Sequence, residues 1–229
     1  IVRLHHLDAP SAKPNIFDPT FDDPQHLSPD SLDRLDYLIA QLKQRGIYVY
    51  LDLLVSRAFT AEDKVVASRQ LRRGAKIASE YNPRLIELQK RYARDLLTHY
   101  NPYTRRRLIN EPAIALMEIV NESSLIRSVR KLLASIPPVY LDELQQFWVQ
   151  WLTAQGTPNL DADADRFLDV EDPQVEAFYA QLQLTYFHDM YASLRSLGVK
   201  IPIAGSNLAM DGLDLVTNAS LDFIDRHAY

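Results

Sequence analysis

The chain has 229 residues, of which 47% are hydrophobic and 24% charged, and 25 Lys and Arg residues against 30 Asp and Glu residues give a net charge of −5. This composition is that of a globular protein long enough for a large core. No sustained basic stripe runs along the sequence, which argues against nucleic acid as a partner. No apolar run has the length of a membrane span. The lack of Cys excludes disulfides, thiolate metal sites and a Cys nucleophile.

Five apolar runs are typical of buried strands. In chain order they cover residues 1–7, 47–55, 113–120, 199–204 and 221–226. The run at 47–55 is continuously apolar and rich in β-branched and aromatic residues, as in a strand that is covered on both faces. This pattern favours a parallel sheet.

Helices are predicted between these strands. Ser28 and Pro29 are typical of a helix start, and Gly46 ends the amphipathic pattern that follows them. Asn82 and Pro83 start a second helix after a polar stretch. Further helices are expected at about 125–134, around the aromatic segment 147–151, at 173–197 and at 211–217. Strands that alternate with helices predict an α/β fold with parallel crossovers, and the length suits a (β/α)8 barrel of roughly 250 residues.

Function in such folds lies at the carboxyl ends of the strands. The polar or notable residues at these ends are His5, His6 and Asp8; Leu54, Ser56 and Arg57; Asn121, Glu122 and Ser123; Ser206 and Asn207; and His227 and Tyr229. Arg3 lies within a strand and requires a buried acceptor, for which Glu118, or a catalytic carboxylate, is the natural candidate. Glu122 directly follows a strand, where proton chemistry is usually placed.

Four segments together carry a resemblance to a known family. They are Val-Arg-Leu at 2–4, Gly-Ile-Tyr-Val-Tyr-Leu-Asp-Leu at 46–53, Ile-Val-Asn-Glu at 119–122 and Asp-Arg-His-Ala-Tyr at 225–229. In this order they resemble glycoside hydrolase family 5, the cellulase-like members of the clan A (β/α)8 retaining glycosidases. The resemblance extends over essentially the whole chain.

The resemblance implies a retaining hydrolase that acts on O-glycosidic bonds of a β-linked oligo- or polysaccharide without a cofactor. Glu122 is then the general acid/base, and Asn121 bonds the sugar 2-hydroxyl. Arg3, His227 and Tyr229 position the catalytic carboxylates, which stand about 5 to 5.5 Å apart in retaining enzymes. An extracellular or periplasmic location is what the family implies.

The sequence also departs from the family pattern. Leu54 stands where the family carries a His, so His5 or His6 is a candidate for that role, and a non-hydrolytic carbohydrate-binding barrel stays open as the alternative function. Residues 1–229 are expected to form a partial catalytic barrel with strands 2 to 6 and a helical insertion at about 123–173. The nucleophilic Glu would then lie outside the given chain, and the given segment alone is expected to be inactive.

Three further patterns suggest other chemistry. His5, His6 and Asp8 could seed a metal-dependent hydrolase, although neighbouring strand residues point to opposite faces. Asp161, Asp163 and Asp165 resemble the start of a calcium loop but lack its Gly and its final Glu, so a solvated loop is the favoured interpretation. Trp148 and Trp151 share a helical face, which indicates core, with sugar stacking as the alternative.

A second Asn-Glu pair competes with Asn121-Glu122. Asn110-Glu111-Pro112 matches the family's motif more literally, but it precedes the strand at 113–120. It is therefore expected at the opposite end of the sheet, and Glu111 is not expected to be catalytic.

Overall fold

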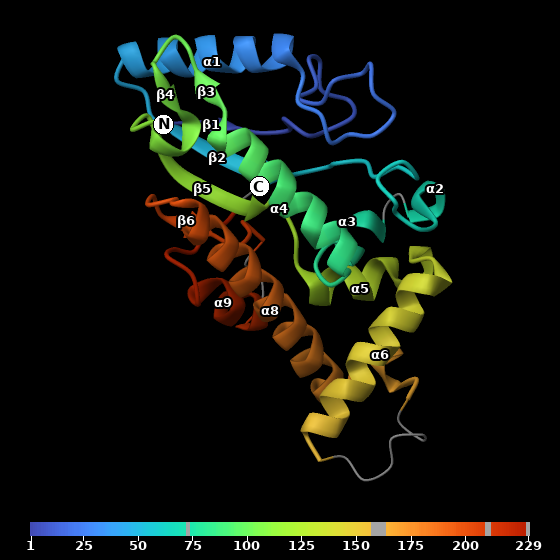
Figure 1. The fold of residues 1–229 in the computed structure, drawn as a ribbon. Coiled ribbons are helices and arrows are strands. Elements are labelled where there is room, and N and C mark those ends of the chain that lie inside the picture. Colours follow the sequence, from blue (N-terminus) through green and yellow to red (C-terminus); the bar gives the residue numbers. More distant parts are fainter. Residues whose placement is uncertain (72–73, 157–163, 209–211, 228–229) are drawn as a thin grey trace.

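The computed structural model describes residues 1–71, 74–156, 164–208 and 212–227 (Figure 1). At its centre is an open sheet of four parallel strands in the order β1-β2-β5-β6. These strands are β1 (Val2–Leu4), β2 (Val49–Leu54), β5 (Ile114–Val120) and β6 (Ile203–Ala204), and a separate antiparallel pair is formed by β3 (Tyr100–Asn101) and β4 (Arg106–Arg107). The predicted parallel α/β class is confirmed, whereas closure into a (β/α)8 barrel stays a prediction.

Helices connect and cover the strands. They are α1 (Pro29–Gln44), α2 (Ser68–Leu71), α3 (Ala75–Ala78), α4 (Pro83–Thr98), α5 (Leu125–Leu132), α6 (Pro138–Ala154), α8 (Pro173–Leu197) and α9 (Gly212–Ala219). Short 3-10 turns are η2 (Leu108–Asn110), η3 (Leu133–Ser135) and η4 (Arg166–Leu168). Within the described ranges, no helix combines the length and apolar character that crossing a membrane requires.

The helix boundaries follow the signals in the sequence. Ser28 caps α1 by accepting the Ser31 N–H at 3.3 Å, and Asn82 caps α4 by accepting the Leu85 N–H at 3.0 Å. Gly198 closes α8 with φ +103°, in the left-handed region that glycine adopts at low cost.

Two hydrophobic clusters form the core. The first packs β2 and β5 against residues of α1, α4 and α8, and the second joins the helices α5 and α6 to the first half of α8. Trp148 is fully buried in the second cluster, stacked on Trp151 at 5.4 Å and edge-on to Phe178 at 5.2 Å. The prediction that these tryptophans belong to the core is confirmed, so Trp148 has no face free for a sugar.

Residues 221–226 do not form the strand that the sequence predicts. Among the described residues, one backbone hydrogen bond joins this segment to β6, from Asp222 N to Ile203 O at 3.2 Å, and the His227 N–H that follows the segment bonds Asn207 O at 2.9 Å. The Ile203 N–H instead donates to the Asp222 carboxylate at 2.8 Å. In a regular β-ladder a backbone carbonyl would accept this N–H. Because the Asp222 side chain accepts it instead, regular strand pairing stops at this position.

The first strand is also shorter than predicted. It ends at Leu4, and His6 has φ +60°, a left-handed conformation that a strand cannot contain. The predicted insertion at 123–173 holds α5, α6 and η4 in its described part. Asp161 and Asp163 of the acidic loop lie outside the described residues.

Candidate active site

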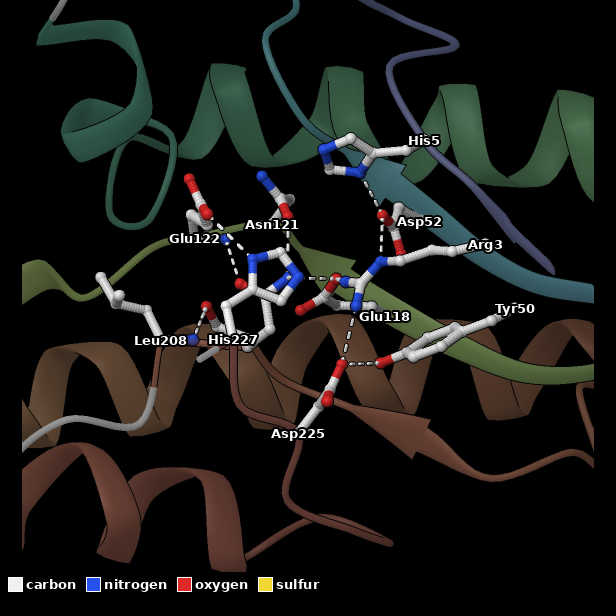
Figure 2. Close-up of polar contacts among 12 residues, drawn as sticks. Arg3, His5, Tyr50, Asp52, Glu118, Asn121, Glu122, Leu208, Asp225 and His227 are labelled. Carbon is white, nitrogen blue, oxygen red and sulfur yellow. Dashed lines mark hydrogen bonds and ion pairs between the residues drawn. The ribbon is translucent and has the colours of Figure 1, made fainter. Parts of the chain in front are cut away.

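Polar side chains from three strands and from the segment 221–227 meet near the carboxyl ends of β1, β2 and β5 (Figure 2). The register pairs Arg3 with Tyr50 and Asp52 with Glu118. Since alternate residues of a strand share a face, Tyr50 and Asp52 stand on the same side of β2. The period of two in the sequence thus gathers these groups on one face of the sheet.

Arg3 lies at the centre of three carboxylates. Its Nε bonds Asp52 Oδ2 at 2.8 Å, one terminal nitrogen bonds Asp225 Oδ2 at 2.8 Å, and the other bonds Glu118. The guanidinium also lies 4.4 Å from the ring centre of Tyr50, whose hydroxyl donates to Asp225 at 2.9 Å. The predicted Glu118 partner is therefore confirmed, while Asp52 and Asp225 are contacts that the sequence analysis missed.

The surroundings of Glu118 favour its protonated form. Burial raises its pKa to about 9, and the negative charge of Asp52 and a hydrogen bond with that residue act in the same direction. Glu118 Oε1 and Asp52 Oδ1 are both buried and have no hydrogen-bond partner among the described residues. A proton shared between the two carboxyl groups would satisfy buried oxygens of this kind.

The two histidines after β1 differ in their surroundings. His5 Nδ1 bonds Asp52, and the His5 ring meets that of His6 edge-on with centroids 4.0 Å apart. His6 is exposed. Leu54 is buried, so the site contains His5 beside the Asp52 carboxylate and an apolar side chain where the family carries a His. Assignment of the family role to His5 stays a prediction.

Glu122 follows β5 in a strained backbone conformation. Its φ is +45°, in the left-handed region that is uncommon for residues other than glycine and that costs of the order of 1 kcal/mol or more. The Glu122 N–H donates to Asn207 Oδ1 at 2.8 Å, and Glu122 Oε1 lies 2.9 Å from His227 Nδ1. The Glu122 side chain is 37% exposed. Solvent can therefore reach its carboxylate.

Asn207 links His227 to the end of β5. Because Asn207 Oδ1 accepts the Glu122 N–H, its Nδ2 group faces Asn121 Oδ1 at 2.7 Å, Glu118 Oε2 at 3.2 Å and His227 Nε2 at 3.1 Å. Its two hydrogens serve two of these three atoms at a time. The other ring nitrogen of His227, Nδ1, lies 2.9 Å from the Glu122 carboxylate.

The structure brings most of the predicted site residues together. Arg3, His5, Asn121, Glu122 and His227 belong to one group of side chains connected through Asp52, Glu118 and Asn207, and the His6 ring contacts the His5 ring of this group. Tyr229 lies outside the described residues.

A buried pair lies behind Glu122. The Ser123 hydroxyl donates to Glu80, and the Ser123 N–H donates to Ser206 Oγ at 2.9 Å. Burial raises the pKa of Glu80 to about 8, so this carboxyl group is largely protonated at neutral pH. Sequence reasoning missed Glu80 because it lies in the polar stretch 56–81, which has no clear periodicity.

Asp8 is directed at the backbone that follows β2. Its two oxygens accept the N–H groups of Val55, Ser56 and Arg57 at 2.9, 3.2 and 3.1 Å. Asp8 therefore does not join His5 and His6, contrary to the alternative based on a metal-dependent hydrolase. In the described part of the chain, no group of three His, Cys, Asp or Glu side chains is placed to hold a metal ion.

Glu111 lies at the opposite end of the sheet, as predicted. It precedes β5, bonds Lys43 Nζ at 2.8 Å and accepts the Ala113 N–H at 3.0 Å. The second Asn-Glu pair is therefore part of the packing at the amino-terminal end of β5.

No family model matches this chain, and no curated protein matches it. Among solved structures, an endo-beta-1,4-mannanase from Thermotoga petrophila is similar with a TM-score of 0.47 and 15% identity, over 86% of this chain and 30% of that one. The hyperthermostable endo-1,4-beta-D-mannanase from Thermotoga petrophila RKU-1, solved with maltose and glycerol, gives the same TM-score and identity over 86% of this chain and 40% of that one. The chain thus spans less than half the length of either mannanase structure, and the likeness is a distant one of fold.

Proposed function

We propose that the protein is a retaining glycoside hydrolase of the family 5 type that cuts O-glycosidic bonds of a β-linked glycan, with Glu122 as general acid/base. The observation that carries the proposal is the contrast between Glu122 and its neighbours. Asp52 and Glu118 are buried and bound to Arg3, whereas the Glu122 carboxylate is 37% exposed at the strand ends and bonded to His227. Asp225, the third partner of Arg3, is 23% exposed, so Glu122 is the most accessible carboxylate of this group.

The chemistry follows from two carboxyl groups on either side of the scissile bond. In the first step, protonated Glu122 gives its proton to the glycosidic oxygen while the nucleophilic carboxylate bonds to the anomeric carbon and the glycosidic C–O bond breaks. In the second step, Glu122 takes a proton from water as the water oxygen attacks the anomeric carbon and releases the nucleophile. We assign the nucleophile to a Glu beyond Tyr229.

The other residues have supporting roles in this proposal. Asn121 bonds the sugar 2-hydroxyl, and Arg3, His5, His227 and Tyr229 hold the carboxyl groups in position. The sheet and the segment 221–226 correspond to strands 2 to 6 of a (β/α)8 catalytic domain, with residues 123–173 as its helical insertion.

The test compares the two Asn-Glu pairs of the chain. In the full-length protein, Glu122→Gln removes the proton donor, and we expect turnover of unactivated glycans to fall by about 10²- to 10⁴-fold or more. Glu111→Gln is the matched control, since it makes the same change at the other end of β5, and its turnover per folded molecule should match the wild type. If Glu122→Gln turned over glycans as fast as the wild type, Glu122 would not be the general acid/base.

Chemical rescue separates a general acid/base from a residue that only shapes the site. With an activated aryl glycoside, Glu122→Ala should still form the glycosyl–enzyme intermediate, because the leaving group needs no proton. Added azide should then attack the anomeric carbon and give a β-glycosyl azide. A wild-type protein that binds glycans yet hydrolyses none would instead favour the non-hydrolytic carbohydrate-binding alternative.

A further inference from the structure

A cavity of about 210 Å³ lies beside the candidate site, between the end of β2 and α3. Leu54, Ser56, Lys76 and Ser79 are among the residues that line it. Leu54 O accepts the Asn121 N–H at 2.8 Å, so the cavity begins next to the residue that precedes Glu122. Pockets for drug-sized ligands measure about 300–1,000 Å³, and this smaller volume suits a single sugar unit.

Lys76 brings a positive charge into this cavity. Its ammonium makes no ion pair and no hydrogen bond with any residue that the structure describes. Burial lowers the pKa of Lys76, and the carboxyl groups of Glu80, Glu122, Glu118 and Asp8 act in the opposite direction. A partly buried cation without a direct partner is costly, and an anion that enters the cavity would relieve this cost.

No carboxyl group around Lys76 holds its ammonium by a hydrogen bond or an ion pair that the structure describes. Each of these groups is bound to another partner: Glu118 to Arg3, Glu80 to the Ser123 hydroxyl, Glu122 to His227, and Asp8 to three backbone N–H groups. Burial also raises the pKa of Glu80, which favours its neutral form and weakens it as a counter-ion of Lys76.

Resting on the glycosidase function proposed above, we infer that this cavity is a subsite for an acidic sugar whose carboxylate or sulfate group binds the ammonium of Lys76. The cavity also offers the hydroxyl group of the exposed Ser56 to the sugar ring. A second cavity of about 330 Å³ shares four lining residues with the first, namely Ser56, Arg57, Phe59 and Ala75. Leu54 is not among its lining residues, so it leaves room for a neighbouring sugar unit.

The test measures binding to the full-length protein with Glu122→Gln, so that no substrate is consumed. Probes are uronate-containing oligosaccharides, the same oligosaccharides with each carboxylate reduced to an alcohol, and sulfated oligosaccharides. We expect acidic probes to bind at least about ten-fold more tightly than their reduced counterparts, since a charge-assisted hydrogen bond is lost on reduction. Whichever class of acidic probe binds more tightly, the uronate-containing or the sulfated oligosaccharides, identifies the anionic group that the cavity prefers.

When Lys76→Met is added to this variant, the preference for acidic over reduced probes should disappear, while the affinity for reduced probes should stay unchanged. Lys76→Arg keeps the positive charge and should therefore retain part of the preference. Lys200→Met is the matched control, because Lys200 is exposed just before β6, away from the cavity, and its loss should change neither affinity. Equal binding of acidic and reduced probes would overturn the subsite while leaving the proposed glycosidase intact. Binding of neither kind of probe would overturn both.

Discussion

Asn207 holds Glu122 at two points. Its side-chain oxygen accepts the Glu122 N–H at 2.8 Å, and its amide nitrogen lies 3.1 Å from Nε2 of His227, whose Nδ1 contacts the Glu122 carboxylate. Asn207, which lies in the segment that follows β6, thus contacts both the left-handed backbone of Glu122 and the His227 ring that bonds the Glu122 carboxylate. The exposed carboxylate therefore has a defined position even though it lies in a connecting segment.

Replacing His227 with Gln tests this arrangement. The variant loses the imidazole that contacts both the Asn207 amide and the Glu122 carboxylate, so we expect kcat on glycans to fall by about ten-fold or more with little change in KM. His227 is partly exposed, and the melting temperature should stay within a few degrees of the wild type. His188→Gln makes the same change at an exposed position on α8 and should leave kcat unaltered. A loss confined to KM would show that His227 binds substrate instead of positioning Glu122.

Removing Arg3 should destabilise the protein strongly. Arg3→Met leaves the carboxyl groups of Asp52, Glu118 and Asp225 without their shared cation, and breaking a buried ion pair on one side costs about 3–5 kcal/mol. We expect a loss near the lower end of this range, because the Arg3 side chain is 23% exposed. Denaturant unfolding measures the change, and a loss below about 1 kcal/mol would contradict a central role for Arg3. Arg3→Lys keeps the charge but not the fork of donors, so it should recover only part of the stability.

The pH dependence of stability should reflect Glu118. Its pKa rises from an ordinary value of 4.5 to about 9 in the folded protein, chiefly through burial. Between these values the folded state keeps a proton that the unfolded state has lost, so the free energy of unfolding decreases as pH rises. The contribution of Glu118 to the free energy of unfolding is therefore fully present below about pH 4.5, and it is lost as the pH rises through about 9.

Glu118→Gln provides the comparison for this prediction, since the amide imitates the protonated acid in size and charge. Unfolding free energies from pH 6 to 9 should fall less steeply for this variant than for the wild type. Glu80, with a pKa of about 8, keeps part of the slope in both proteins. Identical slopes would mean that Glu118 is already ionised at pH 6.

The sequence predicted this site as far as local pattern reaches. Caps and apolar spacing indicated α1, α4 and α8, and the residues that follow each strand pointed to His5, Asn121 and Glu122. Arg3 required a buried carboxylate, and Glu118 is one of its three partners. Each of these inferences depends on neighbours in sequence or on the two-residue period of a strand.

The remaining features depend on contacts between distant segments. Asp225 reaches Arg3 across 222 positions, and Ser123 meets Glu80 across 43. The segment 221–226 has the composition of a strand, yet the Asp222 side chain takes the Ile203 amide and interrupts the ladder. An apolar pattern predicts burial and extension, but it cannot show which acceptor a backbone amide will choose.

Packing behind Glu122 gives a further prediction, centred on Gly205. A Cβ at this position would lie 2.8 Å from both Asn218 Oδ1 and a ring carbon of Phe187, closer than side chains pack. Asn218 Oδ1 accepts the Ser206 N–H at 2.8 Å, and Ser206 in turn accepts the backbone of Ser123, next to Glu122. Gly205→Ala should therefore cost about 1–3 kcal/mol of unfolding free energy through overpacking, and it should also lower kcat by moving this backbone.

Gly212→Ala is the matched control for this substitution. A Cβ at Gly212 meets nothing within 4 Å, and the residue opens α9, where Ala is favoured over Gly. This variant should be as stable as the wild type or slightly more stable, with unchanged kcat. If Gly205→Ala were equally harmless in denaturant unfolding and in turnover, the contacts from Asn218 through Ser206 to Ser123 would not be what holds Glu122 in place.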